Sequence, residues 1–138
     1  MPPLLLNIVD VLLYTVHMGV ILINLFGWIS KKTRRIQLIS IIITSFSWFI
    51  VGFWYGWGYC FLTDWEWEIK AKLGETDLPA SFIHYLANTT LGFNINTDIL
   101  DLITVITFLM AIILCLITNY IDLRRIRIKE KSLNQNFL

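Results

Sequence analysis

Three long apolar stretches dominate the chain, at about residues 4–29, 36–57 and 99–121. A bilayer core of about 30 Å is crossed by roughly 20 mostly apolar residues in helical form, and each stretch reaches that length. Because lipid offers no hydrogen-bond partner to an exposed backbone, segments of this kind cross it as helices. The pattern predicts an all-α membrane protein, a three-span transmembrane helix bundle with one domain over residues 1–138.

The first apolar stretch carries a line of polar side chains. Asp10, Tyr14, His17 and Asn24 follow one another at intervals of four, three and seven residues, which places them on one side of a helix. Polar side chains inside a bilayer are costly and normally face a bundle interior or a wet cavity. We expect this stripe to mark the core of the bundle, with His17 near mid-membrane.

Basic residues are concentrated at two places. Four of them lie at 31–35, between the first two spans, and five more lie at 124–131, after the third. By the positive-inside rule both places are cytoplasmic, so the N-terminus and the segment 58–98 face outward. We expect a multi-pass membrane protein with its N-terminus outside and a basic cytoplasmic tail at 122–138. The start of the chain lacks a basic leader and an A-x-A cleavage site, so we expect an uncleaved span there.

The outer segment 58–98 predicts two short amphipathic helices. Thr63 and Glu66 fit a capping box, in which Glu66 reaches back to the backbone at the N-cap, and Gly74 stands where that helix would end. A second helix is expected at about residues 79–90. The apolar face of the first helix would lie on the outer membrane surface, through Trp65, Ile69 and Leu73.

Part of this segment resembles a known family. The run GWGYCFLTDWE at 56–66 is followed by KLG at 72–74 and SFIHYL at 81–86. With a histidine in the first span, these motifs resemble the small bacterial membrane proteins catalogued as domain of unknown function 2784. The resemblance covers roughly residues 10–120. It implies the fold, the topology and a place in the bacterial inner (plasma) membrane, with no activity to carry over. The matching positions are His17, Cys60, Leu62, Thr63, Glu66, Gly74, Phe82, Ile83, Tyr85 and Leu86.

The chain departs from that family pattern in two ways. Phe61 replaces the proline that follows the cysteine, and Val51, Gly52 and Phe53 stand late in the second span, where relatives often carry an acidic residue. If that acid were catalytic in the relatives, this chain would lack it.

Several polar residues are candidates for chemistry, with alternatives open. His17 is a neutral imidazole bonded to a Ser or Thr of another helix, a proton-handling or ligand-binding group, or a ligand of a metal or a haem. Asp10 is either a snorkelling acid or part of a pocket that opens outward. His84 with nearby carboxylates would form an acid–base group if they came within hydrogen-bond reach. The candidate catalytic residues are His17, Asp10, His84 and Glu66, and the candidate ligand-binding residues are Tyr14, His17, Asn24 and Trp54.

The two cysteines, Cys60 and Cys115, fall at different depths of the predicted bundle. The separation exceeds the reach of a disulfide, so we expect two free thiols. No C-x-x-C motif supports a thiol-redox enzyme, and the possible ligands are too few for a metal site. We therefore expect no metal and no cofactor.

Three functions are compatible with the sequence. One of them, a proton-coupled carrier, would require the protein to oligomerise, because three spans enclose little pathway. Small size, no catalytic motif and helix faces suited to contacts favour an accessory or structural subunit, or a small-ligand-binding membrane subunit. Its partners would be the lipid bilayer and other inner-membrane proteins or a second copy of the chain. The alternative is a membrane enzyme that acts on a lipid or quinone-like substrate at the outer leaflet with histidine and carboxylate groups. A net charge of +1 gives no argument for nucleic acid.

Overall fold

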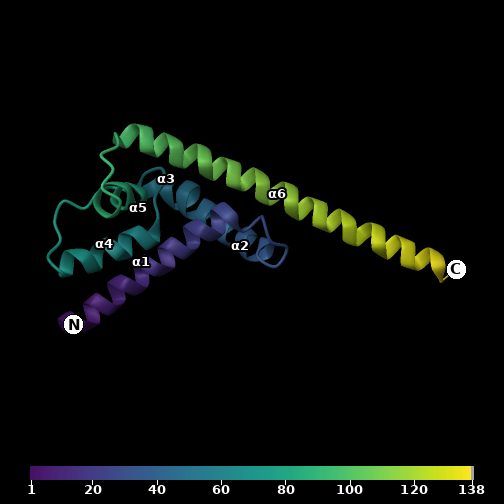
Figure 1. Cartoon of the computed structure of the whole chain (residues 1–138), viewed down its shortest axis with the longest axis horizontal. Helices are drawn as coiled ribbons and strands as arrows, with labels where there is room; N and C mark the ends of the chain where they lie inside the picture. Colours follow the sequence, from purple (N-terminus) through teal and green to yellow (C-terminus); the bar gives the residue numbers. More distant parts are fainter. Residues whose placement is uncertain (138) are drawn as a thin grey trace.

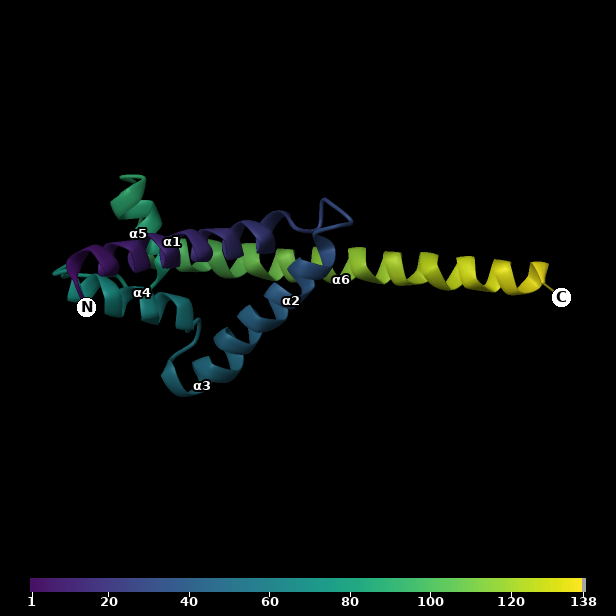
Figure 2. The same cartoon turned by 90° about the horizontal axis from the view of Figure 1, so that it is seen from below.

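The computed structural model describes residues 1–137 and contains helices and no strands in that part of the chain. Three helical segments are long and apolar enough to cross a membrane: α1 (Pro3–Phe26), Arg34–Tyr55 and α6 (Thr97–Asn136). Figure 1 shows α1 and α6 running toward the two ends of the molecule, and Figure 2 shows the second segment slanting away from both. The prediction of an all-α, three-span membrane bundle is confirmed.

The second span is built from three consecutive pieces. These are α2 (Arg34–Ser45), the π-helical turn η1 (Phe46–Val51) and α3 (Gly52–Tyr55). Wide π-helical turns usually occur as short interruptions of an α-helix. Here the interruption contains Ser47, which is buried and donates a hydrogen bond of 2.9 Å to the carbonyl of Tyr59. That bond ties the middle of the span to the chain that returns after α3.

The apolar core of the bundle lies between α2 and α6. Ile41 packs there against Phe108, Ala111 and Cys115, and all four side chains are buried. Small residues such as Ala111 and Cys115 let two helix backbones approach closely inside a membrane. Most other apolar side chains of the spans point outward, as expected for helices surrounded by lipid.

Polar contacts join the last turns of α1 to α2. Gln37 of α2 is fully buried and donates from Nε2 to the carbonyl of Asn24, while Asn24 Nδ2 donates to Thr44 Oγ1. Gly27, just after α1, lies so close that a Cβ there would come within 2.6 Å of the Gln37 Cβ. The stripe predicted on α1 therefore does face the interior, and Asn24 takes part in a helix–helix contact.

The connection between the second and third spans folds onto α1. It contains α4 (Phe61–Lys72), α5 (Phe82–Tyr85) and the π-helical turn η2 (Leu86–Thr90). Figure 2 shows α4 lying beside the N-terminal half of α1, with α5 close to both. The connection is therefore packed into the bundle along α1.

The face that α4 buries differs from the predicted one. Its buried side chains are the polar Thr63, Glu66 and Lys70, whereas Trp65 is 56% exposed. The predicted capping box is also wrong, because α4 begins at Phe61 with Cys60 as N-cap, and Glu66 contacts α1 instead. A buried carboxylate is held best by a charged or polar partner, and α1 provides that partner. The helix end was predicted correctly: the N–H groups of Gly74 and Glu75 close it onto Ala71 and Lys70.

The start of α5 and the end of α6 also differ from the predicted helix boundaries. The helix predicted at 79–90 begins only at Phe82, because the Ser81 hydroxyl caps it by accepting from the N–H of His84. The third span was predicted to end near residue 121, but α6 continues as one helix of 40 residues, about 60 Å long, to Asn136. Lys and Arg residues favour helix and allow the helix to leave the lipid without a break.

Candidate functional site

A histidine, a cysteine and a glutamate meet where α1 lies beside α4. His17 Nδ1 is 3.3 Å from Glu66 Oε2, and His17 Nε2 is 3.8 Å from Cys60 Sγ. Each ring nitrogen of the imidazole therefore faces one reactive group. A nucleophile, a base and an acid that orients the base follow this order in thiol and serine enzymes. We call the three residues the Cys60–His17–Glu66 triad.

Helical spacing explains how two separate segments build this triad. His17 and Asp10 lie seven residues apart, and so two turns apart on one face of α1. Glu66 and Lys70 lie four residues apart on the buried face of α4. With the two helices packed side by side, His17 meets Glu66 and Asp10 meets Lys70. The polar stripe of α1 is thus matched by a polar stripe on α4.

The triad is largely shielded from solvent. Glu66 is fully buried, His17 is 5% exposed and Cys60 is partly buried. Glu66 Oε2 faces His17, but its second oxygen, Oε1, has no hydrogen-bond partner within residues 1–137. An ionised carboxylate in such surroundings is stable only if a cation or strong donor pairs with it. The imidazole of His17 is the group placed to donate a hydrogen bond to Glu66, from Nδ1.

Cys60 is set up to lose its proton. Burial by itself raises the pKa of the Cys60 thiol, but the contact with His17 and the N–H and hydroxyl of Thr63 outweigh it and hold the pKa below its usual value. Cys60 is also the N-cap of α4, where N–H groups without intrahelical partners favour negative charge. Thiolates at such positions are the reactive form of cysteine.

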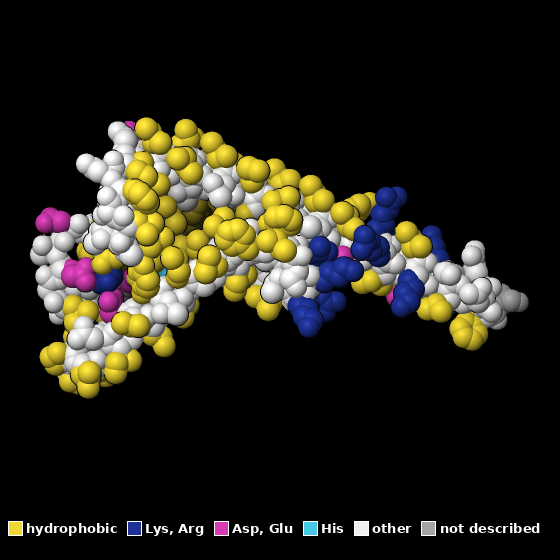
Figure 3. Space-filling model, in the orientation of Figure 1, with side chains coloured by type: hydrophobic (Ala, Val, Ile, Leu, Met, Phe, Trp, Pro, Cys, Tyr) yellow, Lys and Arg dark blue, Asp and Glu magenta, His cyan; other side chains and the backbone are white. Residues whose placement is uncertain are grey.

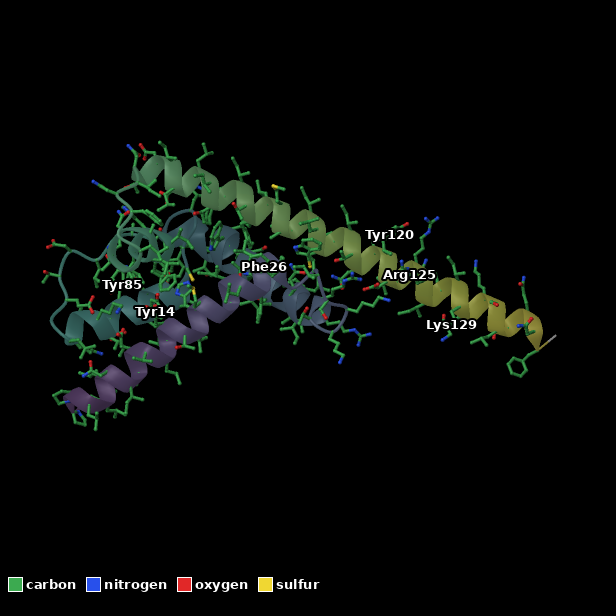
Figure 4. All side chains as sticks on the ribbon, viewed as in Figure 1. Tyr14, Phe26, Tyr85, Tyr120, Arg125 and Lys129 are labelled. Atoms are coloured by element: carbon green, nitrogen blue, oxygen red, sulfur yellow. The ribbon has the colours of Figure 1, made fainter. Side chains whose placement is uncertain are left out.

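An aromatic ring from α5 covers the imidazole. Phe82 is 2% exposed, and its ring stacks on His17 with centroids 3.9 Å apart and planes 22° apart. Tyr14 of α1 packs against Phe82 at 5.4 Å. In Figure 4, Tyr14 and Tyr85 lie in the region where α1, α4 and α5 meet. The imidazole of the triad is therefore covered by an aromatic ring from the connection between the second and third spans, and not from a span.

A buried lysine lies beside the triad. Lys70 is 4% exposed, with its Nζ 3.0 Å from Asp10 Oδ1, 3.5 Å from Glu75 Oε1 and 4.9 Å from the centre of the Tyr85 ring. Burial acts to lower the pKa of Lys70, but the hydrogen bond and charge of Asp10 outweigh it and raise that pKa above its usual value. Lys70 is therefore a fixed cation that fastens α4 to α1.

The structure brings some of the sequence candidates together and leaves others apart. His17 and Glu66 are in contact, and Tyr14 reaches them through Phe82. Asp10 is paired with Lys70. The remaining candidates lie elsewhere: Asn24 bonds to Thr44, the His84 side chain makes no hydrogen bond or ion pair within residues 1–137, and Trp54 is 73% exposed.

Three residues of the site were not among the sequence candidates. They are Cys60, Lys70 and Phe82. The sequence did point to two of them, because Cys60 and Phe82 both belong to the motifs that carry the family resemblance. Lys70 gave the weaker signal of a cation four residues after Glu66, which on its own indicates a surface pair within one helix.

The geometry suits proton transfer better than metal binding. The three groups stand in a row, with the imidazole in the middle, and do not converge on one point. Within residues 1–137 no group of three or more His, Cys, Asp or Glu side chains is arranged to hold a metal ion. What the row can do is hold a thiolate beside an imidazole whose other nitrogen is fixed by a carboxylate.

Comparison with known proteins gives one match. Neither the curated proteins nor the solved structures contain a significant match to this chain. A family model does match, over residues 7–120, which include His17, Cys60, Glu66 and Phe82. Its description is "Protein of Unknown function (DUF2784)". The chain belongs to this DUF2784 family.

Proposed function

We propose that this protein is a membrane enzyme that moves an acyl group by way of a thioester on Cys60. The observation that carries the proposal is the row formed by Cys60, His17 and Glu66, with 3.8 Å and 3.3 Å between successive groups. An accessory subunit has no need of a partly buried thiol placed against a buried histidine–carboxylate pair. Perturbed titratable groups in such a constellation are typical of catalytic sites.

The first half-reaction forms the thioester. The thiol proton of Cys60 passes to His17 Nε2, and the sulfur attacks the carbonyl carbon of an acyl ester. When the tetrahedral intermediate collapses, the ester C–O bond breaks, and His17 returns its proton to the departing alkoxide. The products are a Cys60 thioester and a free alcohol, with no oxidant or reductant involved.

The second half-reaction releases the acyl group. Water or a second alcohol gives a proton to His17 while its oxygen attacks the thioester carbonyl carbon. The C–S bond breaks, and the proton on His17 goes to the Cys60 sulfur. Glu66 takes no proton in this scheme: it faces Nδ1, fixes which ring nitrogen is free and stabilises the imidazolium.

The start of α4 offers a place for the developing oxyanion. The first N–H groups of an α-helix have no intrahelical acceptor, and those of α4 follow directly after Cys60. Backbone N–H groups at this position stabilise negative charge on a tetrahedral intermediate. The N–H of Thr63 already contributes to holding the Cys60 thiolate.

The surroundings favour a lipid-like acyl substrate. Phe82 and Tyr14 cover the imidazole, and Phe61 and Trp65 pack edge to face on α4 next to Cys60. Figure 3 shows mostly hydrophobic side chains on this face of the molecule, hollowed between α6 and the segments opposite. A substrate with a long apolar chain can approach from the bilayer, whereas Phe82 excludes bulk water.

The proposal includes a membrane and an orientation. In Figure 3 the acidic side chains gather at the end where α4 lies, and the basic ones lie along α2 and α6 toward the other end. This distribution supports a bacterial inner-membrane protein with the N-terminus and the triad on the outer side and the C-terminus in the cytoplasm. Cysteine accessibility to an impermeant reagent in whole cells tests that orientation.

Acyl transfer to Cys60 is directly measurable. The purified full chain, in a neutral detergent, is mixed with a p-nitrophenyl ester of an alkyne-tagged long-chain fatty acid. We expect a burst of p-nitrophenol and one acyl group on Cys60, released by neutral hydroxylamine as a thioester is. Cys60→Ser should abolish the thioester. His17→Gln should slow its formation about 100-fold or more, the usual contribution of a general base.

Cys115→Ser is the matched control, because Cys115 lies in the apolar core between α2 and α6. It should leave the burst and the site of acylation unchanged. Equal acylation of Cys115, or unchanged rates in both His17→Gln and Glu66→Gln, would contradict the proposal and return the accessory-subunit hypothesis to first place.

A further inference from the structure

We propose a second site, for the phosphate of an anionic phospholipid, where the connection between α1 and α2 meets α6. A cavity of about 340 Å³ lies there. It is some distance along the molecule from the triad, beyond the end of α1 that carries Asn24. The residues that line it are Lys31, Arg34, Arg35, Asn119, Asp122, Leu123, Arg125 and Ile126.

Four of the lining residues are cations, and one of them, Arg34, is held in place by bonds within the protein. Arg34 Nη1 donates to both carboxylate oxygens of Asp122, at 2.9 and 2.8 Å, and its Nε donates to the carbonyl of Trp28. These bonds join α2 to α6 and hold the Arg34 guanidinium in place. The charges of Lys31 and Arg125 also act on Asp122, but one carboxylate offsets only one of the four positive charges that line the cavity.

The other three cations are available for a ligand. Lys31, Arg35 and Arg125 line the cavity and form no ion pair with an acidic side chain in the described part of the chain. The wall thus has four positive charges and one carboxylate. Arginine binds phosphate oxygens in a forked arrangement, and lysine adds a compact point charge. This excess of positive charge suits a ligand with a single phosphate group.

The position of the cavity favours a lipid phosphate over a soluble one. It lies where α1 has ended at Phe26, α2 begins at Arg34, and the apolar part of α6 gives way to charged residues. Leu123 and Ile126 line it beside the cations, which suits the junction of a headgroup with its glycerol and acyl chains. Figure 3 shows the Lys and Arg side chains next to the hydrophobic surface of the spans. Basic groups in this position attract anionic lipids.

The test compares lipids bound to the purified full chain by native mass spectrometry. In a neutral detergent, phosphatidylglycerol and phosphatidylcholine are added in equal amounts. We expect phosphatidylglycerol to be retained at least tenfold more than phosphatidylcholine. The double variant Arg35→Gln/Arg125→Gln should lose at least four-fifths of that retention, and Lys31→Gln alone should lose a smaller part.

The matched control removes the same charge from outside the cavity. Arg124 and Arg127 belong to α6, are exposed and do not line this cavity. Arg124→Gln/Arg127→Gln should keep phosphatidylglycerol retention within twofold of the original. Equal loss in both double variants would overturn the proposal in favour of diffuse attraction by the basic segment. Unchanged retention in both would overturn it as well.

A further arm separates lipid from soluble phosphate. Millimolar inorganic phosphate should displace less than a tenth of the bound phosphatidylglycerol, because it lacks the apolar contacts at Leu123 and Ile126. Full displacement, with phosphate itself retained by the protein, would overturn the assignment to a lipid. If the arginine double variant fails to fold, Lys31→Gln decides the outcome, since Lys31 is exposed on a turn.

Discussion

His17 and Glu66 are 49 residues apart in the sequence, yet their side chains face each other at 3.3 Å inside the protein. One belongs to a membrane span and the other to the connection between two spans. Their contact means that the connection is part of the protein core. It also leaves His17 Nε2 free to face Cys60, which is the relationship on which the proposed chemistry depends.

Glu66→Gln tests what the carboxylate does. The amide keeps the shape of the side chain but cannot hold a protonated imidazole, and we expect a loss of about 1–3 kcal/mol in the free energy of unfolding. The rate of Cys60 acylation should fall at least tenfold. Unfolding in mixed micelles and the p-nitrophenol burst measure the two effects. Glu68→Gln is the control, because Glu68 is exposed and pairs with Lys72 along α4.

The reactivity of Cys60 should persist at lower pH than that of an ordinary thiol. Its pKa is held below the usual value, and only the thiolate reacts with iodoacetamide, so the midpoint of the rate–pH curve lies on the acid side of that of glutathione. His17→Ala should move this midpoint to higher pH. The measurement is the rate of Cys60 carbamidomethylation in Cys115→Ser protein from pH 5 to 10. A midpoint at or above that of glutathione would show that the thiol is not activated.

Phe82→Ala should make the triad more accessible to solvent, because the Phe82 ring covers His17. The loss of a fully buried aromatic ring costs about 3–5 kcal/mol, so Phe82→Leu, with a smaller loss, accompanies it. In both variants Cys60 should react faster with a water-soluble maleimide, because the ring that covers His17 is gone. Phe53→Ala serves as the comparison, since Phe53 is 72% exposed. If maleimide labelling does not speed up, Phe82 does not control access.

Asp10 and Lys70 should behave as a coupled pair. Asp10→Asn or Lys70→Met leaves one charged group without its main partner in a largely buried place, and each change should cost about 2–3 kcal/mol. The double variant should cost less than the sum of the two, because no stranded charge remains. Unfolding of all four proteins in mixed micelles gives the coupling free energy. Strict additivity would mean that the two residues do not depend on each other.

Much of the fold could be predicted from the sequence, because its causes are local. The three apolar stretches account for the spans by length alone, and Gly74 marks the end of α4 through its left-handed backbone, with φ of 91°. The inward face of α1 followed from the spacing of Asp10, His17 and Asn24, since a helix repeats every 3.6 residues. For these features the sequence carried enough information without knowledge of any neighbour.

The outer connection shows where local reasoning failed. Thr63 and Glu66 have the spacing of a capping box, and Trp65 lies on the apolar face expected to bind the membrane. In the structure, Glu66 and Lys70 turn toward α1 and Trp65 toward the exterior. A capping bond is worth about 1 kcal/mol, whereas leaving the polar stripe of α1 without partners costs several times that amount. The larger effect decided which face of α4 is buried.

The sequence by itself determined the number of spans and the presence of a polar stripe on the first of them. The tertiary structure alone decided what that stripe contacts, and so which residues form the candidate site. Cys60 became part of it because α4 packs along α1 and brings the thiol beside His17, 43 residues away in the chain. Helical periodicity places side chains on a face, but the face opposite is chosen by the packing of segments far apart in the sequence.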